Sequence, residues 1–124
     1  MSCIFCNTDK LNIKVENDLA YTIFDKYPVN EGHMLVIPKR HFQSYFDATK
    51  EELQSIKELI DKCRDLLDKK YNPDGYNIAV NINEAAGQTI MHLHIHIIPR
   101  YKGDVEDPRG GIRNLKPQLV PYKG

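Results

Sequence analysis

The sequence has no long apolar run, and its N-terminus has no targeting signal. Nothing within its 124 residues approaches the roughly 20 consecutive apolar residues that cross a bilayer. The N-terminus also lacks the charged region and the long apolar stretch of a signal peptide. We therefore expect a cytoplasmic protein with no membrane partner.

The sequence also has no excess of either charge. Seventeen basic and seventeen acidic residues give a formal net charge of zero. Nucleic acids and anionic membranes attract proteins with a broad basic surface, so we expect no nucleic-acid partner. Any binding of phosphate groups must then depend on a small local site.

Cysteines are few, and their number is odd. Two of the three, Cys3 and Cys6, form a Cys-x-x-Cys near the N-terminus, which does not make a disulfide framework. A thioredoxin-like redox motif would need a strand-to-helix junction, and no strand precedes these residues. Two explanations of the motif remain: a pair of reduced thiols, or half of a zinc site. Cys63 lies on the apolar face of a predicted helix and is expected to be a small core residue.

The length suits a single domain over residues 1–124, and no internal repeats or low-complexity segments occur. Apolar residues recur at helical spacing from Lys50 to Tyr71, after a capping box that begins at Thr49. Apolar runs and alternations predict strands at residues 13–16, 19–24, 32–38, 76–82 and 92–98. We predict an α+β fold, with an antiparallel sheet of about five strands, one long amphipathic helix and an irregular tail from about residue 101.

Three histidines, His92, His94 and His96, alternate with single aliphatic residues. In an extended strand, residues two apart share a face, so the rings would form a row with about 6–7 Å between neighbours. The aliphatic residues between them would face a core. Imidazole can act as nucleophile, general acid or base, phosphate partner or metal ligand. The row therefore indicates chemistry rather than packing.

Two further interpretations of the row stay open. An edge strand can carry solvated histidines, although three in strict alternation fit this explanation less well than one. A metal site is the chemical alternative, because His-x-His on a strand presents two ligands to one ion.

The alternation of histidine and aliphatic residues, closed by Ile97 and Ile98, resembles the signature of the histidine triad superfamily of nucleotide-binding hydrolases and transferases. Further blocks resemble those of the family in order and spacing: Asp25, residues 33–41, Asn83-Glu84 and Gly87-Gln88. Residues 108–113 are similar to the tail of bacterial members. The resemblance covers most of residues 1–100 and is greatest to the zinc-containing, bacterial-type nucleotide hydrolase branch.

This resemblance implies a nucleoside phosphate bound over the sheet, with its α-phosphate against the histidines. His94 would be the nucleophile and would form a covalent nucleotidyl–histidine intermediate. His96 and Gln88 would bind phosphate oxygens or the bridging oxygen, and His33 would support His94 or the phosphate. Asp25 would bind the ribose, Asn83 and Thr89 would lie on the phosphate side, and the base would be enclosed by Ile4, Phe5 and Leu35.

Simpler explanations exist for several of these residues. Asn83 and Asp25 could be a turn residue and a strand-end residue. Ile4, Phe5 and Leu35 could be plain core, although a base pocket is itself an exposed piece of core.

The resemblance also implies a structural zinc site. In the zinc-containing branch, an N-terminal Cys-x-x-Cys combines with two histidines, which correspond here to His41 and His92. A Cys₂His₂ set with Cys3 and Cys6 is closed, so the ion would tether the short N-terminal segment to the strand of the nucleophile. His92 would then not act as an acid or base.

The implied function is hydrolysis at the α-phosphate of a dinucleoside polyphosphate or a nucleoside phosphoramidate, with release of a nucleoside monophosphate. A purine nucleotide is the expected substrate. Transferase relatives have glutamine in place of the third histidine, so His96 argues against nucleotidyl transfer or phosphorolysis. The resemblance is also compatible with a low-turnover nucleotide-binding regulatory module, and the row of histidines with a catalytic ion. Family members generally pair into two-fold dimers, so a homodimer is expected.

Overall fold

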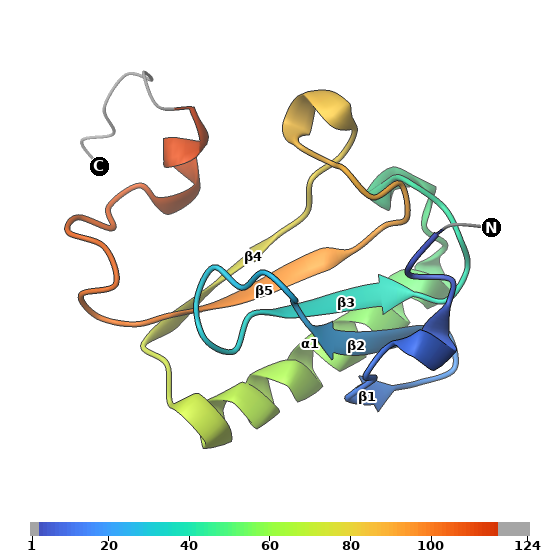
Figure 1. Cartoon of the computed structure of the whole chain (residues 1–124), viewed down its shortest axis with the longest axis horizontal. Coiled ribbons are helices and arrows are strands. Elements are labelled where there is room, and N and C mark those ends of the chain that lie inside the picture. The colour runs from blue at the N-terminus through green and yellow to red at the C-terminus, as the bar shows by residue number, and fades with distance from the viewer. Residues whose placement is uncertain (1–2, 117–124) are drawn as a thin grey trace.

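The computed structural model describes residues 3–116. Within this range, five strands form one antiparallel sheet in the order β1-β2-β3-β5-β4 (Figure 1). The strands are β1 (Val15–Glu16), β2 (Ala20–Phe24), β3 (Met34–Pro38), β4 (Gly75–Ala79) and β5 (Ile95–Arg100). The same range contains one α-helix, α1 (Lys50–Tyr71), and the 3-10 helices η1 (Thr8–Lys10), η2 (Tyr45–Asp47), η3 (Glu84–Ala86) and η4 (Gly111–Leu115). The predicted α+β class is confirmed.

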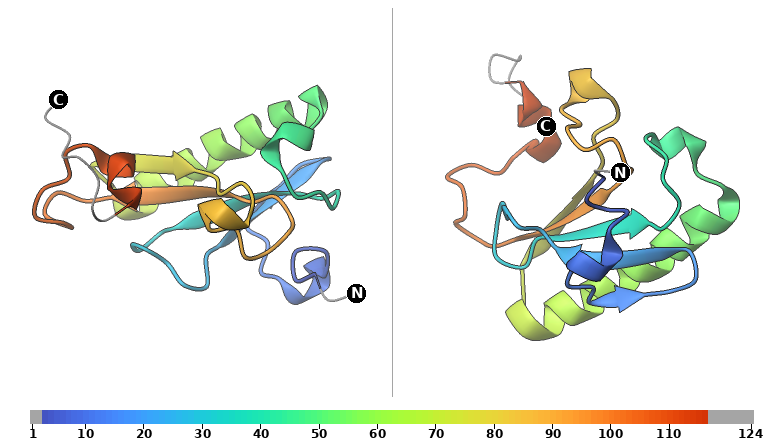
Figure 2. Two further views of the ribbon diagram at one scale, coloured as in Figure 1. Left: turned by 90° about the horizontal axis from the view of Figure 1, so that it is seen from above. Right: turned by 45° about the vertical axis from the view of Figure 1, so that its right-hand side comes forward.

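The sheet has two differently covered faces. Figure 2 shows α1 along one face and the N-terminal segment with η1 on the other. Alternate residues of the strands divide accordingly. Met34, Val36 and Ile97 pack with the apolar side of the helix, whereas Leu35 and Ile37 pack with Phe5 on the opposite face. The same alternation puts His96, the register partner of Leu35, on the face away from α1.

Helix α1 has the predicted bounds, and its start is the predicted capping box. Thr49 accepts the backbone N–H of Glu52, and the Glu52 carboxylate accepts the backbone N–H of Thr49. Asn72 ends the helix in the left-handed conformation, at φ 48°. Cys63 is completely buried on the sheet-facing side, as predicted.

Glu52 makes the start of α1 sensitive to acid. Its carboxylate is buried and accepts two hydrogen bonds from the guanidinium of Arg40, at 2.8 and 2.9 Å. These bonds are the largest cause that holds the pKa of Glu52 below its ordinary value of 4.5. The folded state therefore binds this proton more weakly than the unfolded chain does. The resulting stabilisation is present above the unfolded pKa and is lost as the pH falls through the folded pKa.

We expect Glu52→Gln to lower the free energy of unfolding at neutral pH by about 1 kcal/mol, because it weakens the charged hydrogen bonds between the buried carboxylate and the half-exposed guanidinium of Arg40. The difference from the unmodified protein should shrink as the pH falls below 4.5, the ordinary pKa of Glu52, toward its lower pKa in the folded state. Thermal melts between neutral and acidic pH measure this. Glu51→Gln, in the same helical turn but exposed, is the control and should behave like the unmodified protein. A difference that stays constant with pH would contradict the assignment.

The strand of the histidines starts later than predicted. β5 begins at Ile95, so of the three histidines only His96 belongs to a strand, and the prediction of one strand over 92–98 was wrong at its start. The hydrogen bonds of the preceding residues go elsewhere. The N–H of Leu93 donates to the carbonyl of Phe42, and the ring of His92 contacts the carbonyl of Pro38. At its other end the strand continues through Pro99 to Arg100.

The segment after Arg100 has little regular structure, in line with the prediction, but it contains η4. Residues 117–124 of that tail lie outside the described residues. Among residues 3–116, no helix is long and apolar enough to cross a membrane.

Candidate functional site

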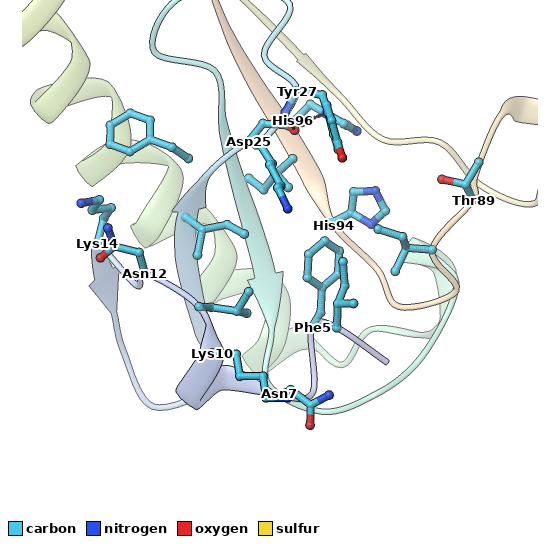
Figure 3. A pocket seen from close by; sticks show the side chains of 17 residues that line it. Phe5, Asn7, Lys10, Asn12, Lys14, Asp25, Tyr27, Thr89, His94 and His96 are labelled. Carbon is cyan, nitrogen blue, oxygen red and sulfur yellow. Dashed lines mark hydrogen bonds and ion pairs between the residues drawn. The ribbon is translucent and has the colours of Figure 1, made fainter. Parts of the chain in front are cut away.

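A pocket of about 970 Å³ opens on the face of the sheet that α1 does not cover (Figure 3). Seven of the residues predicted to bind or act on a nucleotide line it: Ile4, Phe5, Asp25, Leu35, Thr89, His94 and His96. They come from the N-terminal segment, the position directly after β2, β3, the loop before β5, and β5 itself. The topology therefore brings together most of the residues that were predicted to form the nucleotide site.

His94 has a defined ring orientation in this pocket. Its Nδ1 lies 2.8 Å from the carbonyl oxygen of His92, which can only accept, so Nδ1 carries the proton. Phe5 packs edge-on against the ring, with 5.2 Å between centroids. The unprotonated Nε2 is left with a free electron pair, and this nitrogen can act as a nucleophile.

His33 and His96 form a second, linked pair. The backbone N–H of Val29 donates to Nδ1 of His33 at 3.0 Å, so the neutral ring carries its proton on Nε2. That Nε2 lies 2.9 Å from Nδ1 of His96 and 3.3 Å from a carboxylate oxygen of Asp25. His96 therefore accepts at Nδ1 and carries its own proton on Nε2.

Burial keeps this pair neutral. Desolvation is the main cause that lowers the pKa of His96 to about 4, and the neighbouring His94 and His33 lower it further. Desolvation also lowers the pKa of His33, against the opposing effect of Asp25. At neutral pH His96 is thus an uncharged hydrogen-bond donor.

The nitrogen and oxygen atoms of Asp25, His33 and His96 lie close enough together to suit a metal ion. The hydrogen bond from the backbone N–H of Val29 to His33 argues against a metal ion here. A neutral histidine that binds a metal through Nε2 must carry its proton on Nδ1, and here a backbone N–H points at that atom. The arrangement fits a hydrogen-bond chain better than a metal site.

Three predicted site residues lie outside the lining of the pocket: His33, which lies behind His96, and Gln88 and Asn83. Gln88 is buried, and its amide donates to the carbonyls of Gln43 and Ile90 and accepts the N–H of Asn83. Asn83 has φ 72°, and its side chain accepts from Gln43. In this structure Gln88 and Asn83 fix the loop that leads to the histidines.

Several lining residues were not named from the sequence: Lys10, Leu11, Asn12, Lys14, Ile23, Lys26, Tyr27 and Ile90. Ile23 had a usable signal, because it lies two residues before Asp25 in the same extended segment. The lysines had none, since a lysine in a short loop is ordinarily a solvated surface residue.

The second cluster consists of Cys3, Cys6, His41 and His92, whose donor atoms all lie within 4.8 Å of one another. Nδ1 of His92 is 3.4 and 3.6 Å from the two sulfurs, and Nδ1 of His41 is 3.3 Å from Cys6 and 3.1 Å from His92. A tetrahedral zinc ion with Zn–S of about 2.3 Å and Zn–N of about 2.0 Å would hold its ligands roughly 3.5 Å apart. The donor set and its spacing fit such an ion.

The far side of His92 also suits a metal ligand. The residue is completely buried, and its Nε2 donates to the carbonyl of Pro38 at 2.7 Å. This bond leaves the electron pair of Nδ1 facing the cysteines, as is usual for metal-bound histidines. Burial lowers the pKa of His92, which favours the neutral form that a metal needs. The predicted ligand residues can therefore hold a metal ion.

Comparison with known proteins agrees with this picture. Residues 8–103 match the family model described as the HIT domain. An uncharacterised HIT-like protein of Methanocaldococcus jannaschii is 38% identical over 118 residues, which make up 91% of each chain. A bis(5'-adenosyl)-triphosphatase of Dictyostelium discoideum is 38% identical over 90 residues, which are 73% of this chain and 60% of that protein.

Among solved structures, a Zn-bound histidine triad family protein from Mycobacterium smegmatis superposes with a TM-score of 0.75 and 33% identity. The superposition covers 84% of this chain and 78% of that one. The family model, the relatives and the shared fold give one answer, and the chain belongs to the histidine triad (HIT) family.

Proposed function

We propose that the protein is a nucleotide hydrolase that cleaves at the α-phosphate of a dinucleoside polyphosphate or a nucleoside phosphoramidate and releases a nucleoside monophosphate. The observation that carries the proposal is the ring of His94. Its proton is held on Nδ1 by a backbone carbonyl, so its free Nε2 lies in a pocket of about 970 Å³. The triphosphatase relative supports the substrate class.

In the first step, Nε2 of His94 attacks the α-phosphorus, and the bond from phosphorus to the bridging atom breaks. The leaving group departs with the electron pair of that bond, and the nucleotidyl group stays on His94. In the second step, a water oxygen attacks the same phosphorus and its proton passes to solvent. The N–P bond breaks, which returns His94 to its starting form and releases the monophosphate.

His96 would stabilise the charge that develops in both steps. Its Nε2–H can donate to a phosphate or bridging oxygen, and a donor aimed at such an oxygen is typically worth about 10²–10³-fold in kcat. His33 supports His96 at 2.9 Å. Gln88 would act indirectly, because the backbone occupies its amide. Its loop carries Thr89, which lines the pocket, and Asn83, which stays a predicted contact on the phosphate side.

The nucleoside would lie across the apolar part of the pocket. Asp25 is the only carboxylate among the described residues of the lining, and we assign it to the ribose hydroxyls, which donate to carboxylates. Ile4, Phe5 and Leu35 would enclose a purine. Ile4 is 51% exposed, so it can gain burial when a base binds.

We assign zinc to Cys3, Cys6, His41 and His92, an assignment that the zinc-bound relative and the spacing of the donors support. When bound, this ion supplies no group to the reaction and acts as a structural tie. The residues around it hold Phe5 in place, and the carbonyl of Phe5 also accepts the hydroxyl of Tyr21 at 2.6 Å. Phe5 in turn packs on His94.

An activity panel tests the proposal. Diadenosine polyphosphates and adenosine phosphoramidates are incubated with the full chain, with and without inorganic phosphate, and the products are identified. Release of AMP in both conditions is expected. ADP formed only with phosphate would indicate a phosphorylase, and tight AMP binding without turnover would indicate a regulatory module. Full activity after chelation, in protein that stays folded, would exclude a catalytic ion.

We also propose a homodimer. In the described sheet, β4 is an edge strand, and Ile78 on it is 55% exposed. Exposed strand edges pair readily with another strand. We expect a solution mass of twice the 14.3 kDa chain by sedimentation, and a shift toward monomer for Ile78→Lys. A monomer at micromolar concentration would contradict this. We further propose a single domain over residues 1–124, and the cytoplasm stays the predicted compartment.

A further inference from the structure

The loop before β3 fixes the ring of His33 from two sides. The N–H of Val29 donates to Nδ1 of His33 at 3.0 Å, and the N–H of His33 donates to the carbonyl of Asn30 at 3.1 Å. The ring itself is buried. The position of this short loop therefore decides which nitrogen of His33 can accept and which must donate.

The loop is anchored to the segment after β5 by the side chain of Asn30. Its amide nitrogen donates to the carbonyl of Pro99 at 2.9 Å and to a carboxylate oxygen of Asp104 at 2.7 Å, which uses both of its hydrogens. The hydroxyl of Tyr101 adds a bond to the carbonyl of Glu31. Two segments about 70 residues apart in the sequence thus meet at the loop that holds His33.

Asp104 is itself held rigidly. Arg100 donates to both of its carboxylate oxygens, each at 2.9 Å, and Tyr101 donates its N–H at 3.0 Å. The remaining guanidinium nitrogen of Arg100 donates to Asn77 on β4 at 2.7 Å. Such a bidentate, charge-assisted pair fixes the positions of Arg100 and Asp104 relative to each other. The pKa of Asp104 is held far below its ordinary value, chiefly by Arg100, so this carboxylate is ionised at any physiological pH.

We propose that Asn30, held by Asp104, is a positioning residue that fixes the proton positions of His33 and His96. A series of hydrogen bonds links these groups: the N–H of Val29 donates to Nδ1 of His33, and the Nε2–H of His33 donates to Nδ1 of His96. The series ends with the Nε2–H of His96, a residue that lines the pocket. This inference rests on the proposed function for its kinetic consequence, but the proton positions themselves do not depend on it.

The consequence for catalysis concerns the leaving group. In the fixed arrangement, His96 donates a hydrogen bond and keeps its proton, because His33 occupies Nδ1 as a donor and leaves no site for a second proton. Without the hydrogen bond between Asn30 and Asp104, the protons of the His33 and His96 rings can shift to the opposite nitrogens. Nε2 of His96 is then an acceptor. An acceptor would repel the negative oxygen that it should stabilise.

The proton positions are measured directly by two-bond ¹H–¹⁵N correlation of the histidine rings in the zinc-loaded, nucleotide-free protein at neutral pH. Protons on Nε2 of both His33 and His96 are expected. Asn30→Ala and Asp104→Ala should give averaged signals for these two rings, while Asp104→Asn, which keeps an acceptor for Asn30, should restore the single form. A proton on Nδ1 of His96 in the unmodified protein would overturn the proposal, whether or not the protein is a hydrolase.

Kinetics test the consequence with adenosine 5'-aryl phosphates whose phenols differ in acidity. We expect Asn30→Ala and Asp104→Ala to lower kcat about tenfold, the worth of one lost hydrogen bond, with KM little changed. The loss should be larger for the more basic phenolate leaving group. Asp107→Ala is the matched control, because Asp107 is an exposed carboxylate that pairs with the exposed Arg109. Equal losses for all leaving groups, or a change in KM alone, would show a merely structural role.

Discussion

Replacement of His94 by alanine is expected to lower kcat by about 10⁴–10⁶-fold, the range seen when a covalent nucleophile is removed. The two neighbouring histidines cannot replace it. His96 offers a protonated nitrogen to the pocket and His33 is buried behind it, so neither has a free electron pair toward the substrate. The measurement is AMP release under substrate saturation.

Two controls separate lost chemistry from lost structure. The His94→Ala variant should bind AMP in calorimetry with an affinity within about tenfold of the unmodified protein, because the ribose and base contacts are untouched. His94→Gly supplemented with free imidazole should recover part of the turnover, since a diffusible ring can occupy the vacated space. Turnover of His94→Ala close to the original rate would show that another group attacks phosphorus.

Loss of the metal is expected to have the largest effect on stability. Cys6→Ser should reduce the zinc content from one ion per chain to nearly none and lower the Tm by roughly 10 °C or more. A ligand present at about a thousand times its Kd adds about 4 kcal/mol to folding, and each kcal/mol moves the Tm of a domain of this size by several degrees. The metal content is measured by atomic emission, and the Tm by calorimetry.

Cys63→Ala is the matched control for this experiment. Cys63 is the third thiol of the chain, but it is buried against the helix-facing core, away from the metal cluster. Its replacement should leave the zinc content unchanged and cost only the small penalty of a lost sulfur atom. If Cys6→Ser kept a full equivalent of zinc, the assignment of the four ligands would be wrong.

The zinc variant should also affect activity, through Phe5. That residue lies between Cys3 and Cys6, the two proposed cysteine ligands, and packs on the rings of both His92 and His94. Release of the N-terminal segment would remove one wall of the pocket. The proposed metal centre and the proposed nucleophile are thus adjacent, joined by the backbone carbonyl of His92 and by the ring of Phe5.

The local features of the fold could be predicted from the sequence. The capping box at Thr49 and the helical spacing after it defined α1, because both are short-range signals. The five strands followed from apolar runs, although their ends did not. His92 was expected inside a strand, but its ring bonds to Pro38 and lies before the ladder begins. The first residue of a strand depends on where the partner strand pairs with it, and the spacing of apolar residues in the sequence does not carry that information.

The residues that act on the site from a distance could not be predicted. Asn30 and Asp104 are ordinary loop residues in sequence, and only the fold brings them to 2.7 Å. Gln88 illustrates the opposite case, since a side chain expected to face the phosphate is engaged by three backbone groups. Side-chain direction in a loop depends on tertiary hydrogen bonds that a motif does not encode.

The structure divides the three histidines of the motif by the atoms that their rings contact. His92 presents Nδ1 to two cysteines, His94 leaves Nε2 free in the pocket, and His96 presents an N–H there. These three environments support the proposed roles of metal ligand, nucleophile and charge stabiliser. The row of like residues in the sequence thus corresponds to three different chemical states.

The stereochemistry of turnover tests the covalent mechanism most directly. A dinucleotide substrate made chiral at its α-phosphorus by sulfur is hydrolysed in ¹⁸O-labelled water, and the configuration of the released monophosphorothioate is determined. Attack by His94 and then by water inverts phosphorus twice, so overall retention is predicted. Inversion would mean a single displacement by water and would contradict the account.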